Sequence, residues 1–98
     1  QGGKTRLPVS EILYAEAFSH NVTIYTLSCE ISLYESLSAV EKLLGDGFIR
    51  CHRSYIVNIR HVRQSIRSEL VLDDKKATRL PLSRSYYNAV NEAFIRYN

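Results

Sequence analysis

The chain has 98 residues and a mass of 11.3 kDa, which corresponds to one domain with one hydrophobic core and excludes a two-domain enzyme. Its 45% hydrophobic and 23% charged residues, with a net charge of +3, exclude a disordered polypeptide. No apolar run approaches the roughly 18 residues that cross a bilayer, and residues 1–10 contain no stretch resembling a secretion signal, so we expect a soluble cytoplasmic domain with no membrane partner.

The first half of the chain predicts a three-stranded meander followed by a helix. Residues 1–6 are interpreted as a linker or expression scar, and alternating or β-branched segments predict strands at 12–18, 22–27 and 29–34. Apolar residues at helical spacing predict a helix over 36–44. We expect Ser38 and Glu41 to form a capping box at its start, and Gly45 to provide a left-handed stop at its end.

The second half returns to short strands. They are predicted at 48–51, 55–59, 62–67, 69–73 and 77–82, with turns at 52–54 and 73–76. Ser83 fits the N-cap of a last helix over 84–97. The apolar stripe of that helix consists of Tyr86, Tyr87, Val90, Phe94 and Tyr97. The predicted fold class is therefore mainly β with two helices, in one domain over residues 7–98.

The sequence predicts neither a metal site, nor a cofactor, nor catalysis. Cys29 and Cys51 are too few for a disulfide scaffold, so we expect reduced thiols in the core, with a redox pairing as the alternative. Cys51 and His52 are adjacent on an extended segment and point to opposite faces, so one ion could not easily take both. Glycine-rich phosphate loops, nucleophile elbows and paired carboxylates are absent from the sequence, which favours a protein that is not an enzyme.

The charges are unevenly distributed along the chain. Residues 1–47 contain three Lys or Arg and six Asp or Glu, whereas residues 48–98 contain ten and four. The basic half is rich in arginine, whose planar guanidinium pairs with phosphates and base edges. Its arginine cluster consists of Arg50, Arg53, Arg60, Arg63, Arg67, Arg79 and Arg84. A nucleic-acid partner and a solvated face balanced by the acidic half both explain this pattern.

Polar residues that can contact bases or phosphates concentrate in three predicted turns. The turns are Ser19-His20-Asn21, His52-Arg53-Ser54 and Ser83-Arg84-Ser85. Asparagine pairs with adenine and arginine with guanine in the major groove, and backbone amides at a helix N-terminus bind phosphate. Polar residues are also ordinary in turns, so the pattern alone leaves both interpretations open.

Two longer motifs carry a resemblance to a known family. The run from Gly47 to Ile59, GFIRCHRSYIVNI, and the run LPLSRSYY at 80–87 closely resemble the LytTR family of bacterial DNA-binding domains. The ILYAEA segment at 12–17 and the helix at 36–44 match the family's opening strand and first helix. The resemblance covers residues 7–97 and implies an elongated, predominantly β fold whose loops enter successive major grooves.

The resemblance also implies a function and a site. It implies sequence-specific binding to double-stranded DNA by the C-terminal output domain of a two-component response regulator, behind an upstream receiver or sensor domain. Base contacts fall on Asn21, Arg53 and Arg84, with His20 as an alternative to Asn21. Supporting or phosphate contacts fall on His20, Arg50, His52, Ser54, Lys75, Lys76 and Ser83. Repeated half-sites in promoters are expected, bound by a domain that is monomeric when isolated.

Other positions and other functions remain in view. Tyr55, Ile56 and Val57 are predicted core residues, and Asn58 is predicted to bond backbone groups. The ten aromatic residues, seven Tyr and three Phe, make a module for RNA or single-stranded nucleic acid the first alternative. A protein-interaction module, or a small enzyme using Cys51 and His52, is the second.

Overall fold

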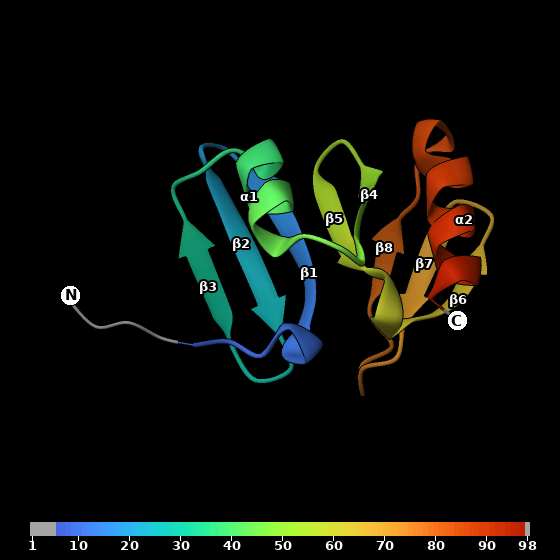
Figure 1. The fold of residues 1–98 in the computed structure, drawn as a ribbon, viewed down its shortest axis with the longest axis horizontal. Coiled ribbons are helices and arrows are strands. Elements are labelled where there is room, and N and C mark those ends of the chain that lie inside the picture. Colours follow the sequence, from blue (N-terminus) through green and yellow to red (C-terminus); the bar gives the residue numbers. More distant parts are fainter. Residues whose placement is uncertain (1–5, 98) are drawn as a thin grey trace.

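Residues 6–97 of the computed structural model form two antiparallel β-sheets that lie side by side along the longest axis of the molecule (Figure 1). The strand order is β3-β2-β1-β5-β4 in the first sheet and β6-β7-β8 in the second. The molecule measures 42 × 25 × 23 Å, so the predicted elongated, mainly β fold with two helices is confirmed. The predicted linker at residues 1–6 lies outside the described residues, apart from Arg6.

The observed elements follow the predicted order. The strands are β1 (Ile12–Phe18), β2 (Asn21–Thr26), β3 (Glu30–Leu33), β4 (Phe48–His52), β5 (Tyr55–Asn58), β6 (Val62–Ile66), β7 (Glu69–Leu72) and β8 (Arg79–Pro81). The helices are α1 (Leu37–Leu44) and α2 (Tyr87–Arg96), with three short 3-10 helices, η1 (Val9–Glu11), η2 (Ile59–His61) and η3 (Arg84–Tyr86). Every predicted strand is present within one or two residues of its predicted bounds.

One face of the first sheet packs against α1. Ala15 of β1 and Ile24 of β2 are buried against Val40 of the helix. Strict alternation places Ile12 and Ala15 on opposite faces, yet both belong to this cluster. A β-bulge between Ile12 and Tyr14 explains the difference, because an extra residue reverses the alternation.

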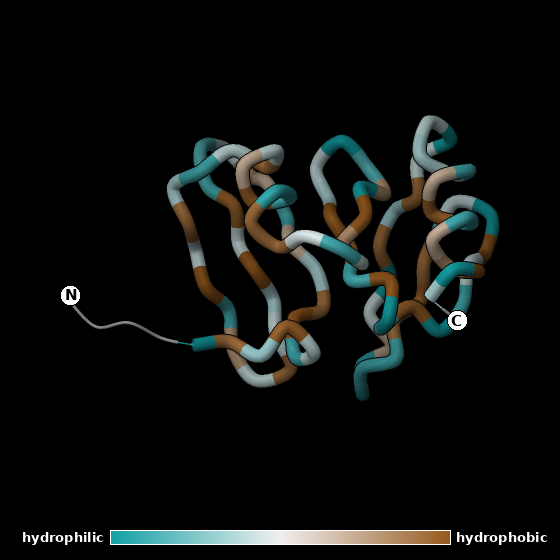
Figure 2. The backbone as a smooth tube through the Cα atoms, viewed as in Figure 1, coloured by the Kyte–Doolittle hydropathy of each residue, from teal (hydrophilic) through white to brown (hydrophobic). Residues whose placement is uncertain are grey.

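A second hydrophobic cluster joins the two sheets and α2. Leu13 and Val57 of the first sheet pack with Leu70 and Leu72 of the second sheet and with Val90 of α2. These side chains are at most 5% exposed, and Figure 2 shows hydrophobic segments along the strands of both sheets. Because one apolar cluster spans both sheets, the turns at their ends keep fixed relative positions.

Helix α1 is capped by Ser36, whose Oγ accepts a hydrogen bond from the N–H of Ala39 at 3.1 Å. The predicted capping box beginning at Ser38 is wrong, because the helix already begins at the buried Leu37. At the other end, Gly45 adopts φ +79°. The helix therefore ends at Gly45 with a positive φ as predicted, but ψ of −149° places this glycine outside the left-handed helical region.

Replacing Ser36 with alanine should lower the free energy of unfolding by about 1 kcal/mol, because an N-cap side chain satisfies a free helix N–H. Ser85→Ala is the matched control, since it removes the same hydroxyl from an exposed position in η3 where the side chain makes no hydrogen bond within residues 6–97. Chemical denaturation of the two variants measures the difference. Equal losses would contradict the assignment of Ser36 as the cap.

Helix α2 begins later than predicted. Ser83 stands at the N-cap position as predicted, but of η3 and not of the α-helix, and among the described residues its side chain makes no capping hydrogen bond. The α-helix starts at Tyr87, which was predicted in the apolar stripe but is 46% exposed. The buried residues of the helix are Val90 and Ala93. A 3-10 turn has fewer residues per turn than an α-helix, which shifts the side chains that face the core.

His61 of η2 joins the N-terminal segment to the end of β7. Its Nδ1 lies 2.7 Å from the Asp73 carboxylate, and its Nε2 lies 2.5 Å from the Ser10 carbonyl oxygen. Both partners are acceptors, so the ring must donate from both nitrogens, as only the imidazolium can. Although burial of the ring favours its neutral form, the hydrogen bonds to Ser10 and Asp73 raise the pKa of His61 above its usual value.

Stability should therefore fall as the pH rises through the folded-state pKa of His61. The folded state favours the protonated ring, so this contribution is complete below the unfolded pKa of about 6.5 and is lost above the raised value. Thermal unfolding between about pH 5.5 and pH 8.5 should show a falling Tm for the native sequence and a flatter profile for His61→Gln. Parallel profiles for the two proteins would refute this role.

Candidate nucleic-acid interface

Three turns lie along one long edge of the molecule, the upper edge in Figure 1. They are the β1–β2 turn, the β4–β5 turn and the segment between β8 and η3. We name this the turn edge and define it as residues 19–21, 53–54 and 83–84. The first two turns lie at the same end of the first sheet because β1 and β5 are antiparallel. Glu16 near the end of β1 pairs with Tyr55 at the start of β5.

Two backbone hydrogen bonds fix the three turns relative to one another. The Ala17 N–H donates to the Ser54 carbonyl at 2.8 Å, and the Ser83 N–H donates to the Cys51 carbonyl at 2.9 Å. The first two turns are two strand spacings apart, about 10 Å. The structure thus brings the three predicted base contacts onto one edge of a single body.

The β1–β2 turn presents His20 and Asn21, and both residues are exposed. Ser19 adopts φ +58°, a left-handed conformation that non-glycine residues rarely take. A two-residue β-hairpin loop requires this positive φ at its first residue, and Arg67 in the β6–β7 turn has it as well. The exposed Asn21 opens β2 and pairs with Phe18 at the end of β1.

The β4–β5 turn presents Arg53, which is exposed at its tip, and Figure 2 shows this turn as hydrophilic. The Ser54 N–H donates to His52 Nδ1 at 3.1 Å. Nδ1 is therefore the acceptor atom of the ring in this turn. The rings of His52 and Tyr55 also form a T-shaped contact, with centroids 5.6 Å apart. His52, a predicted supporting residue, thus shapes the turn that carries Arg53.

The guanidinium groups of Arg53 and Arg84 are exposed, and within residues 6–97 neither forms an ion pair or a side-chain hydrogen bond. By contrast, Arg79 of β8 lies 2.8 Å from Glu69 of β7. Two arginines of the turn edge are therefore available to an anionic partner without first breaking a pair.

Arg50, a predicted supporting residue, is engaged with α1. Its Nη2 donates to Ser38 Oγ at 3.3 Å, and its Nε lies 3.6 Å from the Glu41 carboxylate. Arg50 Nε is buried and has no hydrogen-bond partner among the described residues. The contacts of Arg50 hold α1 against β4.

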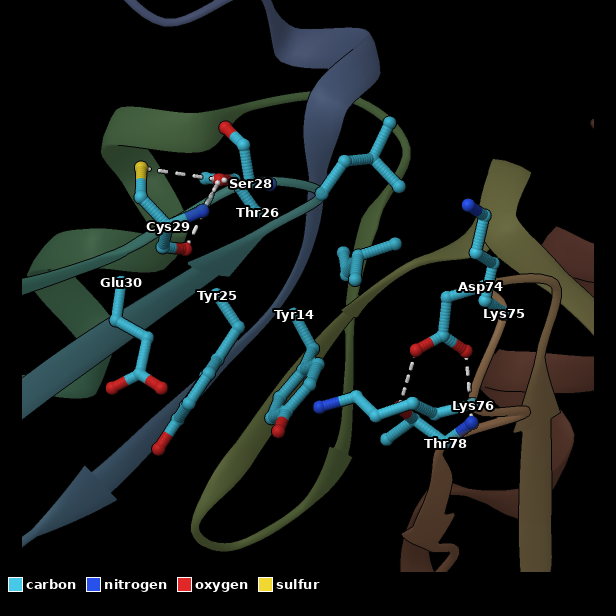
Figure 3. A pocket seen from close by; sticks show the side chains of 12 residues that line it. Tyr14, Tyr25, Thr26, Ser28, Cys29, Glu30, Asp74, Lys75, Lys76 and Thr78 are labelled. Carbon is cyan, nitrogen blue, oxygen red and sulfur yellow. Dashed lines mark hydrogen bonds between the residues drawn. The ribbon is translucent and has the colours of Figure 1, made fainter.

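Lys75 and Lys76, also predicted supporting residues, lie away from the turn edge. Their loop between β7 and β8 projects from the lower edge in Figure 1 and lines a groove of about 550 Å³ with the β2–β3 turn. Figure 3 shows Lys76 extending towards Tyr14 across this groove, and Asp74 bound to Thr78. The structure therefore does not bring the two lysines together with the other predicted contacts.

A cluster that the sequence analysis did not single out supports the first two turns. Glu16 accepts hydrogen bonds from Tyr55 at 3.0 Å and from Tyr25 at 3.4 Å, and Tyr25 stacks on Tyr14 with centroids 4.5 Å apart. Burial raises the pKa of Tyr14 and of Tyr55 to about 12, so these hydroxyls stay protonated. The alternation of β1 puts Tyr14 and Glu16 on one face, and their partners become visible only through strand pairing.

Within residues 6–97, no group of three or more His, Cys, Asp or Glu side chains is arranged to hold a metal ion. None of the helices in this range is long and apolar enough to cross a membrane.

The two cysteines differ in environment. Cys51 is fully buried, as predicted, whereas Cys29 is exposed in the β2–β3 turn, so its prediction as a core residue is wrong. Burial raises the pKa of the Cys51 thiol to about 12. A thiol with this pKa stays protonated at neutral pH and is a poor nucleophile.

Iodoacetamide should therefore label Cys29 and spare Cys51 in the folded protein at neutral pH. Mass spectrometry should show one added group per chain under native conditions and two in denaturant. Cys29→Ser should leave the folded protein unlabelled. Rapid native labelling of that variant would revive the interpretation of Cys51 and His52 as a catalytic pair.

Comparison with known proteins identifies the family. The family model described as the LytTr DNA-binding domain matches residues 3–95. The chain therefore belongs to the LytTR family of DNA-binding domains, which are found in bacterial transcriptional regulators, and the predicted resemblance is confirmed.

Individual relatives support the same assignment. The sensory transduction protein LytT of Bacillus subtilis is 31% identical over 78% of this chain and 33% of its own length. The transcriptional regulatory protein NatR of Bacillus subtilis is 33% identical over 58% of this chain and 25% of its own. The chain thus spans about a third or less of these relatives.

A solved structure matches the fold closely. It is the LytTr DNA-binding domain of a Bacillus cereus protein described as a methyl-accepting/DNA response regulator. The match has a TM-score of 0.74 and 32% identity, and it covers 89% of this chain and 84% of the other.

Proposed function

We propose that the turn edge reads the sequence of double-stranded DNA from the major groove. In this proposal Asn21, Arg53 and Arg84 contact base edges, and the chain acts as the output domain of a response regulator. The observation that carries the proposal is the placement of these three exposed side chains on one edge, held by hydrogen bonds at 2.8 and 2.9 Å.

The size of the turn edge suits a short stretch of a duplex. The longest dimension of the molecule is 42 Å, and one turn of B-DNA is about 34–36 Å long. The three turns are much closer together than this, because the first two are about 10 Å apart and Ser83 is hydrogen-bonded to Cys51 of β4, so the turn edge follows less than one helical turn of the duplex. The major groove is about 12 Å wide, which accommodates a two-stranded turn.

The chemistry of the three side chains suits base edges. A free guanidinium donates two parallel hydrogen bonds to O6 and N7 of guanine, and an asparagine amide pairs with N6 and N7 of adenine. Arg53 and Arg84 have no competing partner within residues 6–97. His20, His52, Ser54 and Ser83 lie beside the three side chains, where they can contact the flanking phosphates.

Selection of bound duplexes from a random library tests this function and returns the motif, its spacing and the number of bound copies. We expect a defined motif that contains guanine and adenine positions, with repeated half-sites bound by two copies of a domain that is monomeric alone. Affinity should fall steeply with salt as counterions are released from phosphates. Recovery of no motif, or a flat salt response, would contradict the proposal.

Competition with single strands separates this function from its main alternative. A module for single-stranded nucleic acid stacks bases on exposed aromatic side chains. Tyr14, Tyr25 and Tyr55 are instead stacked on one another or bonded to Glu16. In a competition assay, we expect unlabelled duplex to displace the bound duplex far better than either of its single strands does. Better displacement by a single strand would favour the alternative.

A further inference from the structure

We propose that Phe18 is a further specificity-determining residue, which contacts the 5-methyl group of a thymine beside the base read by Asn21. This inference rests on the proposed function and adds a contact that neither charge nor hydrogen bonding supplies. It assigns a role to an aromatic side chain that is otherwise unexplained in the fold.

Phe18 is placed at the turn edge by the last pair of the β1–β2 ladder. It lies directly opposite Asn21 in this antiparallel pair. Residues directly opposite each other project from the same face of a sheet, with Cβ atoms about 5 Å apart. A base edge that meets the Asn21 amide is therefore within reach of the Phe18 ring.

The exposure of Phe18 is unusual for its size. The ring is 79% exposed, whereas Phe48, which opens β4, is 3% exposed. Single exposed apolar residues are common on protein surfaces and by themselves indicate nothing. The position of this one is informative, because it flanks a turn whose other exposed residues are polar.

The chemistry of the major groove restricts the contact that a phenyl ring can make there. Phenylalanine offers no hydrogen bond, and the apolar feature that base pairs present in this groove is the thymine 5-methyl group. Asn21 is suited to adenine, so the two side chains together favour adjacent A·T pairs. The contact would distinguish thymine from cytosine at a position where a hydrogen-bonding side chain does not reach.

Deoxyuridine provides a probe for this contact, because it differs from thymidine only by the missing methyl group. In the duplex selected for this chain, each thymidine is replaced in turn, and affinity is measured for the native protein and for Phe18→Ala. The native protein should lose about fourfold in affinity at one position, the value expected for one buried methyl group. Phe18→Ala should bind the thymidine duplex about as weakly and show no loss on replacement.

Ile95→Ala is the matched control, because Ile95 is a similarly exposed apolar residue, at 76%, on α2. This variant should keep the native response to deoxyuridine. Circular dichroism and thermal unfolding should show that both variants fold, since both side chains lie mostly in solvent. If Phe18→Ala keeps the native ratio of thymidine to deoxyuridine affinity, or if no thymidine shows a methyl effect, the inference is overturned while the proposed function stands. Failure to select any duplex would overturn both.

Discussion

Replacing Arg53 or Arg84 with alanine should weaken binding to the selected duplex by about 1–3 kcal/mol each and relax the preference at one base position each. The reason is that each free guanidinium can donate two hydrogen bonds to O6 and N7 of one guanine. Alanine leaves these two acceptors without a partner from the protein. Fluorescence anisotropy with the selected duplex, and with duplexes altered at single positions, measures both effects.

Charge alone has to be separated from base reading in this experiment. Arg96→Ala removes the same charge from an exposed residue in the last turn of α2, far from the turn edge in Figure 1. It should lower affinity for all duplexes slightly and leave the preferences intact. Arg53→Lys keeps the charge but loses the paired donors, so it should relax specificity more than it lowers affinity. Unchanged selectivity in both alanine variants would remove these residues from the proposed site.

Local sequence patterns predicted the elements well because each strand here is short and bounded by a clear turn. The errors arise where distant residues decide the register. Ser36 and Ser38 are equally good caps in isolation, and the burial of Leu37 selects Ser36. The bulge after Ile12 likewise cannot be predicted from the alternation of residues along the strand. Alternation places Ile12 and Ala15 on opposite faces, whereas the bulge brings both of them under α1.

The candidate site was predictable in its residues but not in its geometry. Polar turns and a family motif indicate Asn21, Arg53 and Arg84 without showing that they share an edge. Their alignment depends on contacts between residues far apart in the chain, such as the hydrogen bond from Ser83 to Cys51. Lys75 and Lys76 were predicted as contacts from the same kind of pattern, but their turn lies at the opposite edge of the fold.

The predicted role of Asn58 in bonding backbone groups is confirmed and explains how the segment between the two sheets is held. Its side chain is fully buried at the end of β5, where the chain leaves the first sheet. Nδ2 donates to the Ile12 carbonyl at 2.8 Å and lies 3.4 Å from the Val9 carbonyl, while Oδ1 accepts from the Arg60 N–H at 3.1 Å. One amide thus connects the N-terminal segment, the first sheet and η2.

Asn58→Ala should therefore lower the free energy of unfolding by about 2–4 kcal/mol, because buried backbone groups lose their partners and a small cavity remains. Chemical denaturation gives the loss, and hydrogen exchange should show faster opening at Ile12 and Arg60 than in the cores of β7 and β8. Asn88→Ala, at an exposed position on α2, should change stability by less than about 0.5 kcal/mol. A similarly small loss for Asn58→Ala would mean that the apolar cluster alone holds the sheets together. In that case the alignment of the turn edge would not depend on this amide.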